Sequence, residues 1–184
     1  VLNLLLVLFV GISMGASIMV AQYFGAKQRE ELSYTIGNCI VLTAIAVAIV
    51  MVASLFVTRP LLELLKTPPS IIDWCESYLM ISFLGSVGTA FYNILSGILR
   101  GMGDSFSALI YLLIATVINI ILDVWFVAGI GMGIEGVALA TVIAQGISSV
   151  LCLMKLVKMR EVSDLGRNEL KMSGEHVKRI VSLG

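Results

Sequence analysis

Five long apolar runs, separated by short polar breaks, constrain this chain more than any other feature of its sequence. They cover roughly residues 1–24, 35–57, 74–99, 105–128 and 134–158. A helix needs about 20 apolar residues to cross the hydrocarbon core of a bilayer, and each run is long enough. The chain is 59% hydrophobic and 13% charged, with a mean hydropathy of +1.03, which lies outside the range of soluble domains. We therefore expect an all-α, polytopic membrane protein with five transmembrane helices within 1–158.

The breaks between the runs carry turn residues and charges. They read GAKQREEL (25–32), TRPLLELLKTPPS (58–70), RGMGDS (100–105) and GIGMGIEG (129–136). Pro68 and Pro69 lack the N–H group that a continuing helix needs, which makes the second break firm. The sequence therefore predicts helix ends inside these four segments.

The distribution of Lys and Arg sets the expected orientation, because cytoplasmic loops are enriched in positive charge. If successive connections alternate sides, one side collects ten of the twelve basic residues, and the other holds only Arg59 and Lys66. The polar tail lies on the basic side and is expected to be cytoplasmic. Since Val1 would then begin on the outside, at least one further helix is expected upstream.

Several function classes lack the residues that they need. The formal net charge is zero, so there is no basic surface of the kind that binds nucleic acid. The single histidine, His176, lies in the tail, and the three cysteines are scattered without a CxxC pair. No nucleophile–base pair or metal motif is visible, and we do not expect an enzyme.

One polar pair stands out within the apolar runs, because Asn119 and Asp123 lie four residues apart and share a helix face. A carboxylate at the centre of a membrane helix costs about 2.5–3.5 kcal/mol on insertion scales. Asp123 lies about 8 Å inside the outer end of its run, and Thr141 lies about 10 Å inside the next. The connection between these runs is short, so the two helices should be antiparallel neighbours. Asp123, Asn119 and Thr141 could then converge on one cavity, and Tyr78 could reach the same level.

Carboxylate, amide and hydroxyl oxygens suit a small hard cation. Alternatively, partial desolvation would make Asp123 a proton acceptor. A third interpretation is that the cluster only joins neighbouring helices by hydrogen bonds. Asn93 lies deeper and could line a lower cavity, although structural hydrogen bonding explains it equally well. Packing is the default interpretation of Gln145.

Three stretches resemble a known family of membrane transporters. GISMGASIMVAQYFGAKQREEL (11–32), ILRGMGDS (98–105) and NIILDVWFVAGIGMGIEGVALATVIAQ (119–145) resemble the multidrug and toxic compound extrusion (MATE) family. The resemblance covers about 1–160. It implies twelve helices in two six-helix lobes, of which this chain would hold helices two to six of the first lobe. Residues 159–184 would be the cytoplasmic linker between the lobes and the start of the next helix.

The resemblance also implies a function. Many members bind Na⁺ or H⁺ in the first lobe and export cationic, amphipathic drugs across the cytoplasmic membrane. Asp123, Asn119 and Thr141 match that cation site by position, and Tyr78 matches a hydroxyl near it. An acidic residue of the first helix and the whole second lobe would be further partners, and no cofactor other than the coupling ion is implied.

Two other functions stay open at this point. A lipid-linked precursor flippase of the same superfamily would line its central cavity with basic residues, which are essentially absent from the apolar runs. A membrane scaffold without transport activity would use the polar cluster only to hold its helices together.

Overall fold

The computed structural model describes residues 2–159 and 174–183. Within these ranges the chain is helical and contains no strand. The elements are α1 (Leu2–Gly25), α2 (Arg29–Leu64), α3 (Ile72–Gly101), α4 (Ser105–Val124), the π-helix η1 (Trp125–Gly129), α5 (Ile134–Lys158) and α6 (Gly174–Leu183). The expected all-α fold is therefore confirmed.

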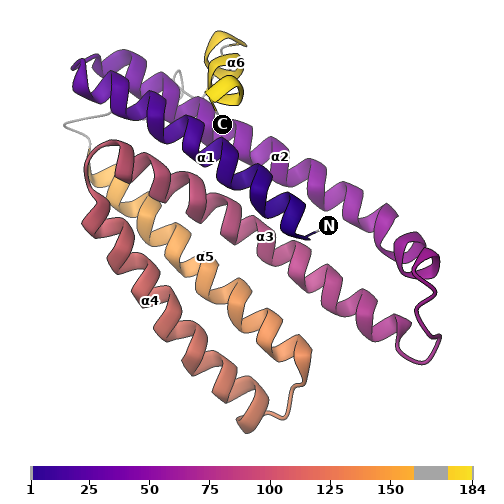
Figure 1. The fold of residues 1–184 in the computed structure, drawn as a ribbon. Coiled ribbons are helices and arrows are strands. Elements are labelled where there is room, and N and C mark those ends of the chain that lie inside the picture. The colour runs from indigo at the N-terminus through magenta and orange to yellow at the C-terminus, as the bar shows by residue number, and fades with distance from the viewer. Residues whose placement is uncertain (1, 160–173, 184) are drawn as a thin grey trace.

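Helix α3 lies at the centre of the arrangement. It packs against the α1–α2 pair on one side and against α5 on the other, while α4 is held mainly by α5 (Figure 1). The α4–α5 hairpin diverges from α3 toward its tip (Figure 1). In the predicted orientation the N-terminal ends of α3 and α5 are the outer ends and their C-terminal ends are the inner ends. Residues at the outer ends are therefore farther apart than those at the inner ends.

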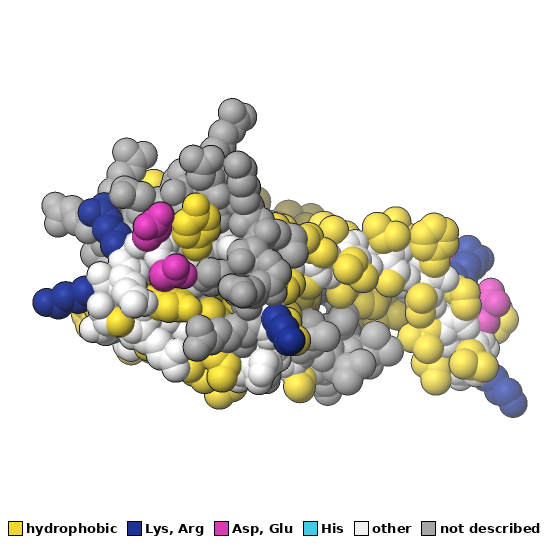
Figure 2. Space-filling view, turned by 90° about the horizontal axis from the view of Figure 1, so that it is seen from above, with side chains coloured by type: hydrophobic (Ala, Val, Ile, Leu, Met, Phe, Trp, Pro, Cys, Tyr) yellow, Lys and Arg dark blue, Asp and Glu magenta, His cyan; other side chains and the backbone are white. Residues whose placement is uncertain are grey.

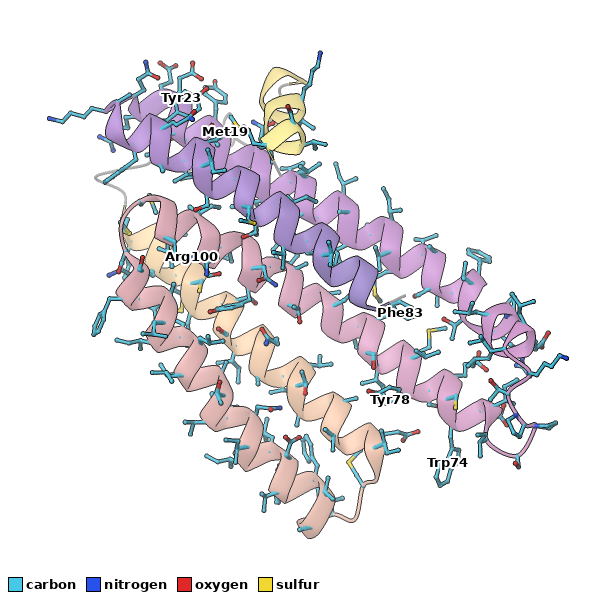
Figure 3. The ribbon with its side chains drawn as sticks, viewed as in Figure 1. Met19, Tyr23, Trp74, Tyr78, Phe83 and Arg100 are labelled. Carbon is cyan, nitrogen blue, oxygen red and sulfur yellow. The ribbon has the colours of Figure 1, made fainter. Side chains whose placement is uncertain are left out.

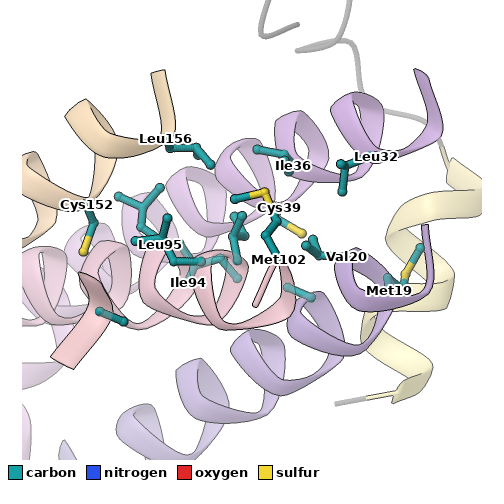
Figure 4. Packing of buried hydrophobic residues seen from close by; sticks show 14 of the residues in the cluster. Met19, Val20, Leu32, Ile36, Cys39, Ile94, Leu95, Met102, Cys152 and Leu156 are labelled. Carbon is teal, nitrogen blue, oxygen red and sulfur yellow. The ribbon is translucent and has the colours of Figure 1, made fainter. Parts of the chain in front are cut away.

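The inner half of the bundle holds the main hydrophobic core. Side chains from α1, α2, α3 and α5, among them Met19, Ile36, Ile98 and Leu156, are almost completely buried there (Figure 4). Gly101 permits the close approach of α1 and α3, since a Cβ at this position would lie 2.6 Å from the Ser17 carbonyl oxygen. Burial of this kind gives each packed helix one face away from lipid.

Helix α2 differs from its predicted span, because it is 36 residues long and continues through Pro60 to Leu64. At 1.5 Å per residue it is about 54 Å long, so it exceeds the hydrocarbon thickness of about 30 Å. The break begins at Leu65 and contains Lys66, which has a positive φ of 54°. Pro60 did not end the helix, whereas the segment containing Pro68 and Pro69 did.

The inner end of the α4–α5 hairpin is fixed by Asp104. Its carboxylate caps α4 by accepting a hydrogen bond from the Ser107 N–H, at 3.1 Å, and it lies 3.4 Å from the Lys155 ammonium of α5. Burial by itself would raise the pKa of Asp104, but the Ser107 hydrogen bonds and the Lys155 charge outweigh it and lower the pKa. The Ser148 hydroxyl adds a second link by donating to the Tyr111 carbonyl of α4.

The outer end of the predicted 105–128 span is not a regular α-helix. After Val124 the chain forms the π-helix η1, in which the Ile130 N–H donates to the Trp125 carbonyl at 3.0 Å. Gly136 of α5 lets this wider turn pack closely, because a Cβ there would lie 3.1 Å from the Phe126 Cβ. The extra residue in this turn was not predictable from the apolar pattern.

The surface of the described residues fits a membrane. Helices α2, α3, α4 with η1, and α5 are long and apolar enough to cross a bilayer, and Phe9–Gly25 of α1 forms a shorter apolar helix. On the face that Figure 2 shows, acidic and most basic side chains gather at the two ends of the long helices. The predicted orientation, with a cytoplasmic tail, stays a prediction.

Helix α6 lies across the inner ends of α1 and α2 (Figure 1). Its Ile180 is fully buried in the main core, whereas Val181 and Leu183 are exposed. Residues 160–173 of the predicted linker lie outside the described residues.

Candidate functional site

A hydrogen bond between α4 and α5 joins two of the predicted site residues. Asn119 Nδ2 donates to Thr141 Oγ1 at 3.3 Å. The Thr141 hydroxyl in turn donates to the Val137 carbonyl of its own helix, at 3.1 Å. Asn119 and Thr141 therefore lie at the same depth along α4 and α5, as the short connection between these helices predicts.

Asp123 lies one turn outward from Asn119 on α4. Its Oδ1 atom is buried and has no hydrogen-bond partner among the described residues. A buried carboxylate oxygen without a donor is costly, and such atoms in native structures call for an explanation such as a bound ion or water. The carboxylate therefore has a free coordination position inside the protein.

A cavity of about 220 Å³ lies between α3 and α5, and neither Asn119 nor Asp123 is among the residues that line it. Tyr78 and Thr141 both line this cavity, together with Ser82, Ser86 and Thr89 of α3. The Ser86 and Thr89 hydroxyls donate to carbonyls of α3 itself, and each hydroxyl oxygen can still accept a hydrogen bond. The structure thus brings Tyr78 and Thr141 together, and the Asn119 bond links them to α4.

A larger cavity of about 940 Å³ opens beside the first, where α3 and α5 diverge. Its lining is largely apolar and includes Trp74, Tyr78 and Glu135. Figure 3 shows Trp74 and Tyr78 projecting from the same side of α3, toward the α4–α5 hairpin. Trp74 is 76% exposed, and Tyr78 borders both cavities.

Asn93, the residue assigned to a lower cavity, is half-buried. Its Nδ2 donates to the Thr89 carbonyl at 2.9 Å, and it is not among the lining residues of either cavity. A role in substrate binding stays a prediction for this residue.

Sequence reasoning missed several residues that line the cavities. Ser82, Ser86 and Thr89 follow a spacing of three to four, which places them on one face of α3 but does not show that this face borders a cavity. Glu135 belongs both to the predicted span 134–158 and to the predicted break 129–136, and it lines the larger cavity from the first turn of α5. Among the described residues, no three His, Cys, Asp or Glu side chains gather as a metal site.

Comparison with known proteins places this arrangement in a family. The family model MatE matches residues 1–125, about two thirds of the chain. The chain belongs to the MATE family. The resemblance seen in the sequence is thereby confirmed, and MATE proteins are membrane transporters rather than enzymes.

Two MATE relatives from Bacillus subtilis (strain 168) show how far the similarity extends. The chain is 33% identical to the probable multidrug resistance protein YoeA over 98% of its own length and 41% of that protein. It is 39% identical to the probable multidrug resistance protein YpnP over 60% of its length and 25% of that protein. The chain therefore spans at most about two fifths of these relatives.

Solved structures agree on the fold. A multidrug resistance MATE family transporter of the MOP superfamily, in an inward-facing conformation, superposes with a TM-score of 0.90 at 24% identity, over 98% of this chain and 41% of that one. A MOP superfamily transporter from Pyrococcus furiosus, described as having a binding pocket of reverse polarity and a different function, gives a TM-score of 0.89. The same fold is thus shared by transporters whose binding pockets differ.

Proposed function

We propose that this chain forms part of a cation-coupled antiporter that exports cationic or amphipathic drugs and toxic compounds across the cytoplasmic membrane. Na⁺ or H⁺ is the coupling ion. Asp123 is the coupling carboxylate, Asn119 and Thr141 supply further oxygens, and Tyr78 borders the site. Multidrug resistance proteins among the relatives support this proposal.

The unpartnered Oδ1 atom of Asp123 is the observation that carries the proposal. A carboxylate that served only to join helices would accept a hydrogen bond from a neighbouring helix at this buried oxygen. Asn119 and Thr141 already pair with each other one turn away, which leaves Asp123 free to bind a cation or a proton. Occupied and empty states of Asp123 differ in charge, and such a difference can shift the balance between two conformations.

The cavity linings support a cationic cargo. Trp74 and Tyr78 offer aromatic faces, and Glu135 offers a negative charge within a largely apolar wall. No Lys or Arg occurs among the described residues that line either cavity. An anionic, lipid-linked precursor would find no positive partner there, which favours drug export over flippase activity.

The proposal is tested by drug resistance in cells that express the full-length product of the gene. Asp123→Asn keeps the size of the side chain but removes its charge, and we expect it to abolish resistance at unchanged membrane abundance. Asp73→Asn is the matched control, because Asp73 is an exposed acid at the outer end of α3, and it should leave resistance intact. Full resistance with Asp123→Asn would contradict the proposed role of the carboxylate.

A further inference from the structure

One side of α3 changes in chemical character along its length. Trp74, Tyr78, Ser82, Ser86 and Thr89 recur at intervals of three or four residues, which places them on one side of the helix. The first two line the larger cavity and the last four line the smaller one, so Tyr78 borders both. From the outer end inward, this side of α3 therefore passes from aromatic rings to hydroxyl groups over about 22 Å.

The hydroxyls of the smaller cavity differ in what they can offer a ligand. Ser86 Oγ donates to the Phe83 carbonyl at 2.6 Å and Thr89 Oγ1 donates to the Gly85 carbonyl at 3.2 Å, so both can serve a ligand only as acceptors. Among the residues that the structure describes, the Ser82 hydroxyl makes no hydrogen bond, and it can therefore both donate and accept. The cavity thus presents at least one donor together with several acceptors.

The described lining of the smaller cavity carries no charge. Beyond Tyr78 and the hydroxyls of α3, it consists of Phe9, Gly85, Val137, Ala138, Thr141 and Val142. A charged group would lose its hydration there without gaining an ionic partner, which is costly. A neutral group that both donates and accepts hydrogen bonds, such as a hydroxyl or an amide, would find partners in the hydroxyls. The chemistry of the lining therefore selects a neutral polar group.

The sizes of the two cavities indicate how they share one ligand. Sites for drug-sized molecules measure about 300–1,000 Å³, and the larger cavity, at about 940 Å³, lies in this range. The smaller cavity, at about 220 Å³, is too small for a whole molecule of this kind but holds one end of it. Ser82 lies about 6 Å inward of Tyr78 along α3. A short chain on an aromatic ring beside Tyr78 can therefore reach Ser82.

We propose that the two cavities form one cargo site with two parts, and that its preferred cargo is an aromatic cation carrying a neutral hydrogen-bonding group. The outer part binds the aromatic ring and the positive charge through Trp74, Tyr78 and Glu135. The inner part binds the neutral group, and Ser82 is the residue that recognises it. This inference rests on the proposed drug export and extends it, because it names a second chemical feature of the cargo and the residue that selects it.

The test compares two cargoes that differ by a single hydroxyl. Pentyltriphenylphosphonium and its hydroxypentyl analogue share the aromatic cation, and only the second carries a neutral hydrogen-bonding group at the end of its chain. The dissociation constants of both are measured with the purified full-length protein, and their ratio removes any effect common to the two. Ser82→Ala removes the hydroxyl and Ser82→Thr keeps one. Ser149→Ala is the matched control, because Ser149 is a half-buried serine that bonds to its own helix and is not among the lining residues of either cavity.

Ser82→Ala should reduce the preference for the hydroxypentyl cation, measured as this ratio, about two- to tenfold relative to Ser149→Ala, as expected for the loss of one neutral hydrogen bond. Ser82→Thr should keep the wild-type ratio. Glu135→Gln should weaken the binding of both cations by the same factor, since their charge is the same. If Ser82→Ala and Ser149→Ala give the same ratio, the smaller cavity does not bind cargo and the inference is overturned. If the wild-type protein binds neither cation, the proposed cargo class fails and the inference fails with it.

Discussion

Replacing Thr141 by valine tests whether Thr141 binds the coupling cation or only joins α5 to α4. Valine has nearly the same shape but lacks the hydroxyl that accepts the Asn119 hydrogen bond and donates to the Val137 carbonyl. Thr116→Val is the matched control, because the Thr116 hydroxyl makes only the equivalent bond within its own helix, to the Leu112 carbonyl at 2.9 Å. The two variants therefore differ in the loss of the contact between α4 and α5.

The structural part of the effect is small. Hydrogen bonds between membrane helices average about 0.6 kcal/mol, and a length of 3.3 Å places this one among the weaker bonds. Loss of a ligand to a charged group costs more, about 1.5–3 kcal/mol, which corresponds to a dissociation constant raised tenfold or more. At a cation concentration about 100 times the wild-type dissociation constant, the cation would stabilise the wild-type protein by about 2.7 kcal/mol and the Thr141→Val variant by about 1.4 kcal/mol or less.

Thermal unfolding of the purified full-length protein is measured as a function of Na⁺ concentration and, separately, of pH. It reports both the structural effect of the substitution and its effect on cation binding. We expect Thr141→Val to shift the half-saturating cation concentration at least tenfold relative to Thr116→Val, with similar Tm values in the absence of the cation. If the two variants share one half-saturating concentration and differ only in Tm, Thr141 is a helix contact and the reasoning is refuted.

Three further predictions concern packing, the inner end of the hairpin and access to the outer cavity. Gly101→Ala places a methyl group 2.6 Å from the Ser17 carbonyl oxygen and should destabilise the protein by about 1–3 kcal/mol; Gly25→Ala, with open space around it, should be nearly neutral in the same thermal unfolding. The lowered pKa of Asp104 means that its carboxylate adds stability above the ordinary carboxyl pKa and that this stability is lost as the pH falls through the lowered value. Asp104→Asn should therefore reduce Tm at neutral pH, and its Tm should converge with that of wild type once the pH falls below the lowered pKa; parallel curves would contradict this. Cys75, which is half-buried and lines the outer cavity, should react with a maleimide in the folded protein, whereas labelling of the two fully buried cysteines without denaturant would show that the packing is wrong.

The sequence predicts the helices of this fold well, because apolar runs of membrane length have few alternatives. α5 occupies the same residues as its apolar run, Ile134–Lys158. The length of α2 was underestimated, because Arg59 and the nearby acids look like a loop in sequence. In the structure Arg59 Nε lies 3.9 Å from Glu63 Oε1, and Arg59 Nη1 lies 3.7 Å from Glu76 Oε2 of α3. Arg59 and Glu63 belong to the last turns of α2, beyond its apolar stretch.

The candidate site was predictable in part. Equal depth on antiparallel helices predicts that Asn119 and Thr141 meet, and they do. The cavity serines of α3 could not be inferred in the same way, because their role depends on how far α3 and α5 diverge. Small residues such as Gly88 set that separation, since a Cβ added at Gly88 would lie 3.0 Å from the Gly146 N atom of α5, and the periodicity of a single helix does not show how closely it approaches its neighbour.

Transport driven by an imposed cation gradient tests the central proposal most directly. The full-length wild-type protein is reconstituted in liposomes loaded with tetraphenylphosphonium, and a Na⁺ or H⁺ gradient is applied as the only energy source, with the membrane potential clamped. We predict that one of the two gradients drives cargo against its own gradient, and that Asp123→Asn abolishes this movement. Uphill transport that persists in Asp123→Asn, or wild-type transport that responds to neither gradient, would contradict coupling through Asp123.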